Sequence, residues 1–451
     1  MLSLGCLVAT LLAFIVIEFY VRRSQYPPGP FPIPLLGNLP SFVARYYFSG
    51  HGPADVMLTW KRSHGNVFTV WFGPLALVAV TDYDVAVQTY VKEGDVHAKR
   101  FEVSLFTLLR EGYGLVLSNG TRWQEQRRFA LRIFKDFGYG KNLMQERILQ
   151  EYQVRMNELN KEFEGNEGKL TFNPRTKFLD LMVGSIINLI LVGYSFDETN
   201  ADEFRAIRED LEYALREFNI VDFALINEFT KKLPILGRRF KKIKKIQEKP
   251  VQFILKQIEK RKADIASGVH ILQEGVPQDF LDAYLLEMRR REKMGDMGEF
   301  SEKQVSFAIL DAWQAGMETT IATISWGFAY LVNHVGIQQK MREELLRVVG
   351  KNATVEMGHK LDLPYTSAVV TFKPERFIED KTLEQKVVPF SLGKRQCLGE
   401  GLARAEVFLI LANIVKDYRL TDEDGTVDWQ HGSDFGFLKM PYAANITFEK
   451  L

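Results

Sequence analysis

Apolar residues recur every three or four positions along most of this chain, and charged residues fill the positions between them. This spacing predicts amphipathic helices over residues 144–163, 201–218, 243–262 and 301–335. One segment differs, because β-branched and aromatic residues flank Gly73 and Pro74, which predicts a hairpin over residues 67–80. The sequence contains no tandem repeat and no low-complexity block. The pattern therefore predicts a mainly α fold with a small β-sheet.

The amino end is the most apolar part of the chain. No charged side chain occurs between Met1 and Ile17, and Arg22 and Arg23 close the apolar run. About 20 residues of helix span the core of a bilayer, and a cleaved signal peptide would carry its positive charges before the run. This order favours a retained transmembrane signal-anchor over residues 1–21, with the rest of the chain on the cytosolic side. A buried amino-terminal helix is the alternative.

Six prolines follow the apolar run. Proline fixes φ and lacks a backbone N–H, so it can continue neither a helix nor a central strand. Residues 22–40 are therefore interpreted as a stiff, proline-rich linker between the anchor and the remaining domain, residues 41–451. The six prolines are Pro27, Pro28, Pro30, Pro32, Pro34 and Pro40.

Composition and charge exclude several classes of protein. Of the 451 residues 46% are hydrophobic, and 58 Lys and Arg residues face 57 Asp and Glu residues, so the chain is neither disordered nor a polybasic nucleic-acid binder. The basic segment 231–249 is interpreted as a solvated helix face, or as a contact with anionic lipid headgroups. Two cysteines cannot form a disulfide framework, which favours a reducing compartment. None of the 7 histidines has the spacing of a helical zinc motif.

The strongest chemical signal surrounds Cys397. This cysteine lies between Gly393 and Gly399, beside Lys394 and Arg395, and just before a predicted helix. The two cations and the helix dipole predict a lowered thiol pKa, and a thiolate is what a soft metal ligand requires. The glycines permit tight turns and let a flat cofactor approach the backbone. A cysteine buried as a small hydrophobic residue is the alternative, which these neighbours disfavour.

This segment resembles the haem-binding loop of the cytochrome P-450 family. The family pattern Phe-x-x-Gly-x-Arg-x-Cys-x-Gly is matched at Phe390, Gly393, Arg395, Cys397 and Gly399. The resemblance implies a haem b cofactor whose iron has the Cys397 thiolate as its axial ligand. It also implies that Phe390 packs near the sulfur and that Arg395 binds a haem propionate.

A second motif carries the same resemblance on the helix predicted over residues 301–335. Its sequence, Ala-Gly-Met-Glu-Thr-Thr from 315 to 320, is similar to the oxygen-activation motif of the family. The resemblance implies that Ala315 and Gly316 leave room for oxygen and that Glu318 and Thr319 relay protons. For this motif taken alone, a glycine packed against a neighbouring helix is the alternative.

Two shorter matches concern arginines. Trp123 and Arg127 lie four residues apart and so share one face of a predicted helix, where the resemblance implies that they bind a haem propionate. The segment Pro374-Glu375-Arg376-Phe377 matches a further family phrase, and the proline-rich linker matches another. Together the matches cover essentially the whole chain.

The resemblance implies both a fold and an activity. The fold is the mainly α cytochrome P-450 fold, with a small β-sheet and an N-terminal transmembrane anchor helix. The activity is haem-thiolate monooxygenation of a lipophilic substrate, a xenobiotic, steroid or fatty acid, with O2 and with electrons that NADPH supplies through a flavoprotein reductase. Members of this microsomal branch lie in the endoplasmic reticulum membrane, with the catalytic domain in the cytosol. A thiolate-haem sensor without oxygenase activity is disfavoured by the motif at 315–320.

One hallmark of the family is absent from its expected place. A Glu-x-x-Arg helix should precede Arg376, but LDLPYTSAVV passes directly to TFKPERF, which predicts a missing block at the 370/371 junction, Val370 to Thr371. The pairs Glu344/Arg347 and Glu287/Arg290 have the right spacing but precede this junction, and they are interpreted as surface ion pairs. The alternative function is therefore a catalytically inactive, haem-deficient splice or gene-model variant that persists as a membrane-bound binding or decoy protein.

Overall fold

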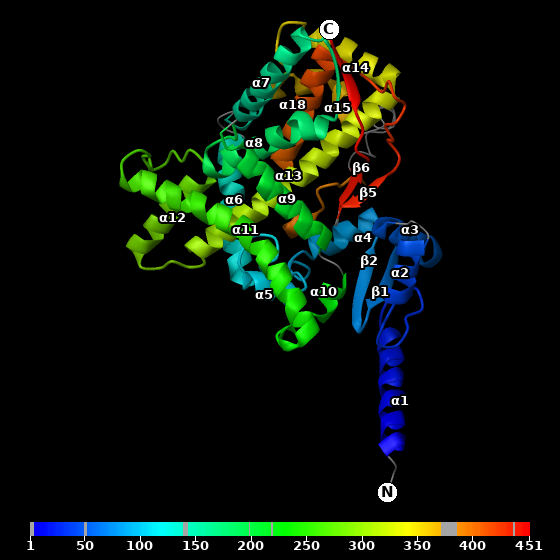
Figure 1. The fold of residues 1–451 in the computed structure, drawn as a ribbon. Coiled ribbons are helices and arrows are strands. Elements are labelled where there is room, and N and C mark those ends of the chain that lie inside the picture. Colours follow the sequence, from blue (N-terminus) through cyan, green and yellow to red (C-terminus); the bar gives the residue numbers. More distant parts are fainter. Residues whose placement is uncertain are drawn as a thin grey trace. The chain divides into compact units, whose positions relative to one another are not determined.

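A computed structural model describes residues 4–48, 52–138, 143–197, 199–217, 220–370, 386–435 and 438–451. Helices make up most of this part of the chain, and its strands pair into small antiparallel sheets (Figure 1). The prediction of a mainly α fold is confirmed. The chain divides into two compact units: unit 1 holds residues 1–98 and 388–396, and unit 2 holds residues 99–387 and 397–451.

Unit 1 is built around one hairpin. Strand β1 (Val67–Phe72) pairs antiparallel with β2 (Leu75–Val80), which confirms the predicted hairpin. Gly73 has a φ of 61°, the left-handed conformation that its turn requires. Phe68 of β1 is buried with Trp60 of α3 (Pro53–His64). The other elements of unit 1 are α1 (Leu4–Arg23), α2 (Leu39–Phe48), α4 (Tyr83–Val87), the π-helix η1 (Gln88–Lys92) and the 3-10 helix η5 (Gly393–Arg395).

The predicted linker packs along β1. The Asn38 side chain donates to the carbonyls of Pro30 and Phe31, and its Oδ1 accepts the backbone N–H of Trp71 at 2.8 Å. Asn38 is only 1% exposed, so these bonds satisfy a buried amide. A Cβ added at Gly29 would lie 2.0 Å from the carbonyl oxygen of Thr69, so only glycine allows the two backbones to approach this closely. The segment is therefore folded against the β1 strand of the hairpin.

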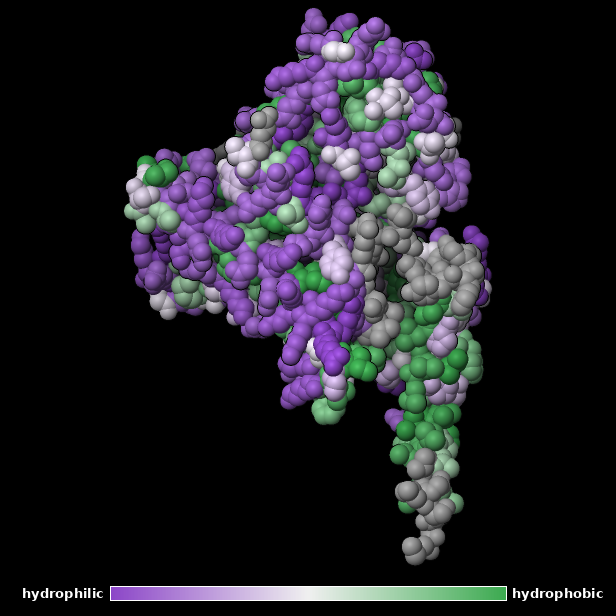
Figure 2. All heavy atoms as spheres, in the orientation of Figure 1, coloured by the Kyte–Doolittle hydropathy of each residue, from purple (hydrophilic) through white to green (hydrophobic). Residues whose placement is uncertain are grey.

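The predicted anchor overlaps α1, along which apolar side chains gather (Figure 2). Within the described ranges, no helix is both long enough and apolar enough to cross a membrane. The anchor over residues 1–21 is not confirmed and stays a prediction. Near the carboxyl end of α1, the ring centroids of Phe19 and Trp71 lie 4.9 Å apart, and the Tyr20 hydroxyl donates to the Pro32 carbonyl at 3.3 Å.

Unit 2 holds the long helices, and four of them were predicted from periodicity. The segments 144–163, 201–218 and 301–335 are confirmed as α7, α9 and α13, whereas 243–262 lies inside the longer helix α11, which contains Pro250. Among the residues that the structure describes, the helices of unit 2 are α5 (Ser104–Arg110), α6 (Gly120–Gly138), α7 (Leu143–Glu164), α8 (Asp180–Val192), α9 (Ala201–Glu217), α10 (Ile220–Leu225), α11 (Pro234–Ala266), α12 (Phe280–Met294), α13 (Glu302–Asn333), α14 (Val335–Val348), α15 (Pro364–Val370) and α18 (Glu400–Asp417).

The described part of unit 2 also contains short elements. Strands β3 (Lys169–Phe172), β7 (Ile446–Lys450) and β4 (Tyr418–Thr421) form one antiparallel sheet in that order, and β5 (Gly432–Phe435) pairs with β6 (Leu438–Pro441). The π-helix η2 (Arg175–Leu179) leads directly into α8. The 3-10 helices are η3 (Thr230–Lys232) and η4 (Met357–Asp362).

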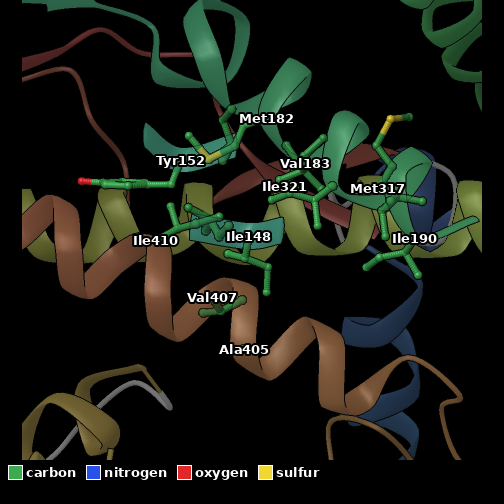
Figure 3. Packing of buried hydrophobic residues seen from close by; sticks show 14 of the residues in the cluster. Ile148, Tyr152, Met182, Val183, Ile190, Met317, Ile321, Ala405, Val407 and Ile410 are labelled. Carbon is green, nitrogen blue, oxygen red and sulfur yellow. The ribbon is translucent and has the colours of Figure 1, made fainter. Parts of the chain in front are cut away.

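Helix α13 runs through the core of unit 2. It packs on α8 and α18, and both of these helices also pack on α7. Figure 3 shows Met317 and Ile321 of α13 together with Val183 of α8, Ile148 of α7 and Val407 of α18. All five side chains are buried. Dense packing on several sides therefore fixes the helix that carries the motif at 315–320.

Two Glu-x-x-Arg pairs differ in their outcome. The pair Glu287 and Arg290 is an ion pair at 2.7 Å with an exposed arginine, as predicted. Glu344 is not a surface residue: it is 5% exposed and accepts the backbone N–H groups of Tyr365 and Thr366 at 2.9 and 2.7 Å. The surface prediction for Glu344 was wrong because this carboxylate satisfies the free N–H groups at the start of α15. The phrase at 374–377 lies outside the described residues.

Candidate functional site

An exposed stripe interrupts the buried surface of α13. Ala315 and Thr319 are exposed, whereas Met317 and Thr320 between and beside them are buried. The Thr319 hydroxyl donates to the Ala315 carbonyl at 2.6 Å, one turn earlier. Residues four apart share one helix face, so the motif presents a small side chain and a hydroxyl to the same open side.

Gly316 lies on a different side of α13. A Cβ added at this glycine would lie 2.6 Å from the Ile187 side chain of α8. Close packing of α8 on α13 therefore accounts for Gly316, which agrees with the alternative that this glycine packs against a neighbouring helix. Ala315 is the small residue at the open stripe.

Cys397 lies immediately before the amino end of α18. The backbone N–H groups of Gly399 and Glu400 donate to its sulfur. The side chain is exposed, but surrounding atoms remove part of its hydration, and this desolvation raises the thiol pKa. The predicted lowering of the thiol pKa was therefore wrong for the chain by itself. Desolvation and the charge of Glu400 raise this pKa, and they outweigh the backbone N–H groups and Arg127, which lower it.

Helix α6 brings a cation to this cysteine. Arg127 acts electrostatically on Cys397, and desolvation lowers the pKa of the guanidinium. The guanidinium carbon lies 6.0 Å from the ring centroid of Trp123, which is buried. The predicted pair on one face of α6 and the predicted thiolate ligand are thus brought together within unit 2.

The remaining haem-loop residues, Phe390, Gly393 and Arg395, belong to unit 1. Gly393 has a φ of 73°, and a Cβ added there would lie 1.8 Å from the carbonyl oxygen of Tyr90, so only glycine fits beside η1. Nε of Arg395 donates to the Ala98 carbonyl at 2.7 Å. The tight turn predicted at Gly393 is confirmed.

The residues of unit 2 fit a haem-thiolate centre. A thiolate ligand needs nearby positive charge, and Cys397 has Arg127 and two backbone N–H groups. A Cβ added at Gly399 would meet no atom within 4 Å, so the backbone beside the cysteine is open to a flat group. The exposed stripe of α13 supplies a second open surface.

Glu318 does not face the open stripe. Its side chain is only 4% exposed and lies 3.4 Å from both Arg175 of η2 and Arg208 of α9. Burial raises its pKa. The two residues of the predicted proton relay therefore lie in different surroundings. Thr319 is at the open side of α13, whereas the Glu318 carboxyl is in a buried ionic cluster.

Comparison with known proteins decides the family. The sequence profile described as Cytochrome P450 matches residues 27–371 and 370–448. The chain belongs to the cytochrome P450 family. It is similar to the probable cytochrome P450 cyp-35D1 of Caenorhabditis elegans, at 28% identity over 98% of both chains. It is also similar to cytochrome P450 2B2 of Rattus norvegicus and cytochrome P450 2A13 of Homo sapiens, each at 27% identity, over 94% and 99% of both chains.

The P450 family is one of haem-thiolate monooxygenases, and the match to it is interrupted once. The two matched segments meet at residues 370 and 371, which is the junction where the sequence predicts a missing block. The alignments with cyp-35D1 and 2A13 run over 499 and 520 positions, which is more than the 451 residues of this chain. These alignments therefore include residues that the relatives have and this P450 chain lacks.

A buried carboxylate ties a loop of this P450 chain to α13. Asp311 accepts the backbone N–H groups of Leu115 and Val116 at 2.7 and 2.9 Å and pairs with Arg110 at the end of α5. Gln304, two turns earlier on α13, bonds both the N–H and the carbonyl of Gly114 at 3.1 Å. The loop is thus fastened to α13 one turn before Ala315. Sequence reasoning missed this contact, although a lone acid in the apolar run AILDAW is a usable signal.

Glu406 of α18 is a second carboxyl that sequence reasoning missed. It is 0% exposed, and within the described ranges neither carboxyl oxygen has a well-formed hydrogen bond. Burial raises its pKa well above the ordinary value, and the Thr320 hydroxyl lowers it by less. Burial therefore favours the neutral form of Glu406, which faces the residue after Thr319 on α13.

Replacing Glu406 by Met is expected to raise the free energy of unfolding by about 1–3 kcal/mol. An unsatisfied neutral polar group in the core costs roughly this amount, and Met fills a similar volume. The urea midpoint at pH 7 measures the change. Glu209→Met on exposed α9 surface is the control and should shift the midpoint little. A lower midpoint for E406M would show that the carboxyl makes a stabilising bond.

Proposed function

We propose that this chain is a membrane-anchored haem-thiolate monooxygenase that oxidises a lipophilic small molecule. The observation that carries the proposal is the arrangement within unit 2, where the amino end of α18 holds Cys397 beside Arg127 of α6 and α13 presents an open stripe. The substrate class is a xenobiotic, a steroid or a fatty acid.

Each residue has a defined task in this proposal. Cys397 binds the iron as a thiolate, and the N–H groups of Gly399 and Glu400 stabilise its negative charge. Trp123 and Arg127 hold a propionate. Ala315 leaves room at the open stripe, and the Thr319 hydroxyl holds a proton at Oγ1. Haem, when bound, supplies the activation of O2 and the insertion of one oxygen atom into the substrate.

The partners follow from the same proposal. Electrons come from NADPH through a flavoprotein reductase, since none of the proposed site residues can supply them. The apolar first 21 residues, closed by Arg22 and Arg23, support an anchor in the endoplasmic reticulum membrane with the catalytic part in the cytosol. The near-equal numbers of basic and acidic residues argue against a nucleic-acid partner.

The interrupted family match favours a second candidate. The block that relatives have at the 370/371 junction should contain the Glu-x-x-Arg helix, and Arg376 would lack its partner without it. A buried unpaired charge destabilises a fold by about 3–5 kcal/mol. The second candidate is therefore a haem-deficient, inactive variant of a P450.

The reduced carbon monoxide difference spectrum of the full chain, with haem content per protein, separates the two candidates. The monooxygenase proposal expects a strongly red-shifted Soret band that Cys397→Ser abolishes, because serine supplies no thiolate. Cys6→Ser is the matched control and should leave the band unchanged, since Cys6 lies on α1 of unit 1. Absence of haem, or haem without this band, would support the inactive variant.

A further inference from the structure

The two outer edges of the β1–β2 hairpin in unit 1 differ. The linker segment 22–40 covers the edge of β1, where the Thr69 N–H donates to the Pro28 carbonyl at 3.2 Å. On the same edge, the Asn38 N–H donates to the Trp71 carbonyl at 2.6 Å. Within the described ranges, no hydrogen bond outside the hairpin involves the backbone of β2. One edge of this sheet is therefore covered and the other is open.

The register of the hairpin identifies the backbone groups at the open edge. Thr69 and Trp71 bond the linker segment, so the alternate residues of β1 are the ones that bond β2. Their partners on β2 are also alternate residues, namely Leu75, Leu77 and Ala79. The N–H and carbonyl groups of the other three residues of β2 point away from β1, and these residues are Ala76, Val78 and Val80.

No charge protects the open edge of β2. Leu77 and Val78, in the middle of the strand, are 42% and 41% exposed, and the sequence LALVAV contains neither a charged residue nor a proline. Strands β3, β4 and β6 also lie at sheet edges, and each carries a basic residue: Lys169, Arg419 and Lys439. Charged side chains and prolines on edge strands hinder pairing with another chain. Strand β2 has neither safeguard.

The open edge fits an extended, uncharged strand with apolar side chains on both faces, and a second copy of this chain supplies one in its own β2. An antiparallel pair centred on Val78 places this residue opposite the same residue of the second copy, and Ala76 opposite Val80. Each outward residue then belongs to a hydrogen-bonded pair, whose members exchange both N–H···O=C bonds. This register uses the whole open edge and places no two like charges opposite each other.

We propose that the open edge of β2 is a self-association site, at which two copies of this chain pair β2 with β2 antiparallel about a two-fold axis at Val78. The arrangement closes on itself, because the linker segment of each copy covers the outer edge of its β1 and leaves a third copy no edge to join. The expected product is a dimer and not a fibre. No residue of the proposed haem site takes part, so the inference is independent of the proposed function.

Disulfide trapping in the full chain, held in a nonionic detergent, tests the register. Val78→Cys places two thiols at the axis, where paired Cα atoms lie about 5.5 Å apart, within the range of about 4.4–6.8 Å that a disulfide spans. Leu77→Cys is the matched control, because it is equally exposed but lies about 7–8 Å from its counterpart, beyond that range. Under mild oxidation, V78C should form the symmetric disulfide and L77C should not. Peptide mass spectrometry distinguishes this disulfide from bonds of the exposed Cys6 and Cys397.

Sedimentation velocity in the same detergent tests the dimer. The wild-type chain should sediment as a dimer and Val78→Lys as a monomer, because two lysines would face each other at the axis. Val78→Thr is the matched control, since threonine is also β-branched and uncharged, and this variant should stay dimeric. Val78 is exposed, so neither substitution should unfold the chain, which an unchanged urea midpoint would confirm.

Three results would overturn the proposal. The first is a wild-type chain that sediments as a monomer. The second is a dimer that survives Val78→Lys, because another surface, such as the apolar helix α1, would then hold the two copies together. The third is equal cross-linking of V78C and L77C, which would show random collisions without a fixed register. Each of these results is obtained with or without bound haem, so the failure of the monooxygenase proposal leaves this test intact.

Discussion

Replacing Asp311 by Ala is expected to lower the free energy of unfolding by about 3–5 kcal/mol. The change leaves the Arg110 guanidinium, 9% exposed, without its carboxylate, and it also frees the backbone N–H groups of Leu115 and Val116. An uncompensated buried charge alone costs about this much, against a total stability of about 5–15 kcal/mol for a typical fold. Urea unfolding at pH 7 measures the loss.

The chain provides a matched control for this prediction. Lys303 of α13 pairs with Glu111, the residue after Arg110, at 2.6 Å, but both side chains are exposed. Lys303→Met removes an ion pair between the same helix and the same loop, and solvent replaces what is lost, so stability should change little. Equal losses for Asp311→Ala and Lys303→Met would show that burial does not decide the energy of these pairs.

The Asp311 contact also bears on activity. The loop after α5 is held by Gln304 and Asp311 of α13, one to three turns before Ala315. A loop released by Asp311→Ala no longer keeps a fixed position against α13. For the proposed monooxygenase we therefore expect a less precisely formed site, since rigid support determines the precision of a functional site.

The elements of this fold could be predicted because periodicity is a local property. The hairpin and the helices α7, α9 and α13 follow directly from spacing. The start of α11 at Pro234, ahead of the predicted segment at 243, was missed because the basic run there has fewer apolar positions, although proline suits a first turn.

The candidate site was predictable in its motifs and not in its contacts. Arg110 and Asp311 are 201 positions apart, so no spacing rule could pair them. Asp180, Asp311 and Glu406 nevertheless share a signal: each is a lone acid in an apolar run, where burial requires a partner or a proton. The thiol pKa of Cys397 was misjudged because sequence shows neighbouring charges but not desolvation, which is decided by packing.

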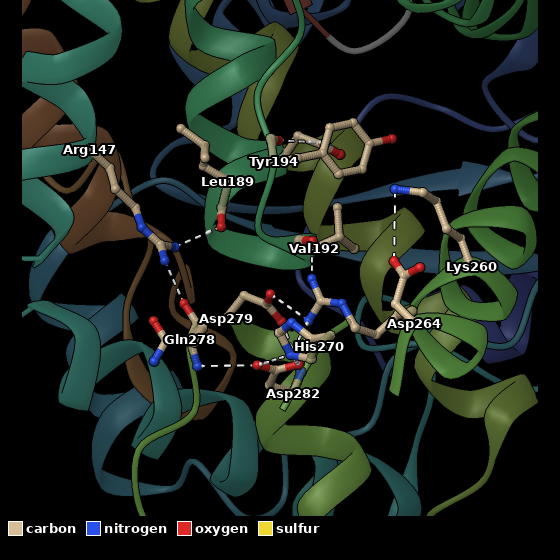
Figure 4. Close-up of polar contacts among 12 residues, drawn as sticks. Arg147, Leu189, Val192, Tyr194, Lys260, Asp264, His270, Gln278, Asp279 and Asp282 are labelled. Atoms are coloured by element: carbon tan, nitrogen blue, oxygen red, sulfur yellow. Dashed lines mark hydrogen bonds and ion pairs between the residues drawn. The ribbon is translucent and has the colours of Figure 1, made fainter. Parts of the chain in front are cut away.

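Replacing Arg261 by Met should also cost about 3–5 kcal/mol at pH 7.5, and here the loss should depend on pH. Arg261 of α11 pairs with Asp279 at 2.8 Å and with Asp282, and donates to the Val192 carbonyl at 2.6 Å. His270 also bonds Asp282, at 2.9 Å (Figure 4). Both aspartates are nearly inaccessible, at 0% and 1% exposed, so the variant leaves two buried carboxyls without their guanidinium.

The sign of the pH dependence follows from Asp279. Burial raises its pKa to about 6, and Arg261 opposes that rise. Without Arg261 the folded-state pKa rises further, so the variant loses more stability than the wild type as pH increases from about 5 to 8. Lys260→Met is the control, since Lys260 pairs with Asp264 at 3.8 Å on exposed surface and should change stability by less than about 1 kcal/mol. A loss of stability for Arg261→Met that is constant across this pH range would contradict the prediction. It would mean that Asp279 stays ionised without the guanidinium, and that the amino end of α12 alone stabilises its charge.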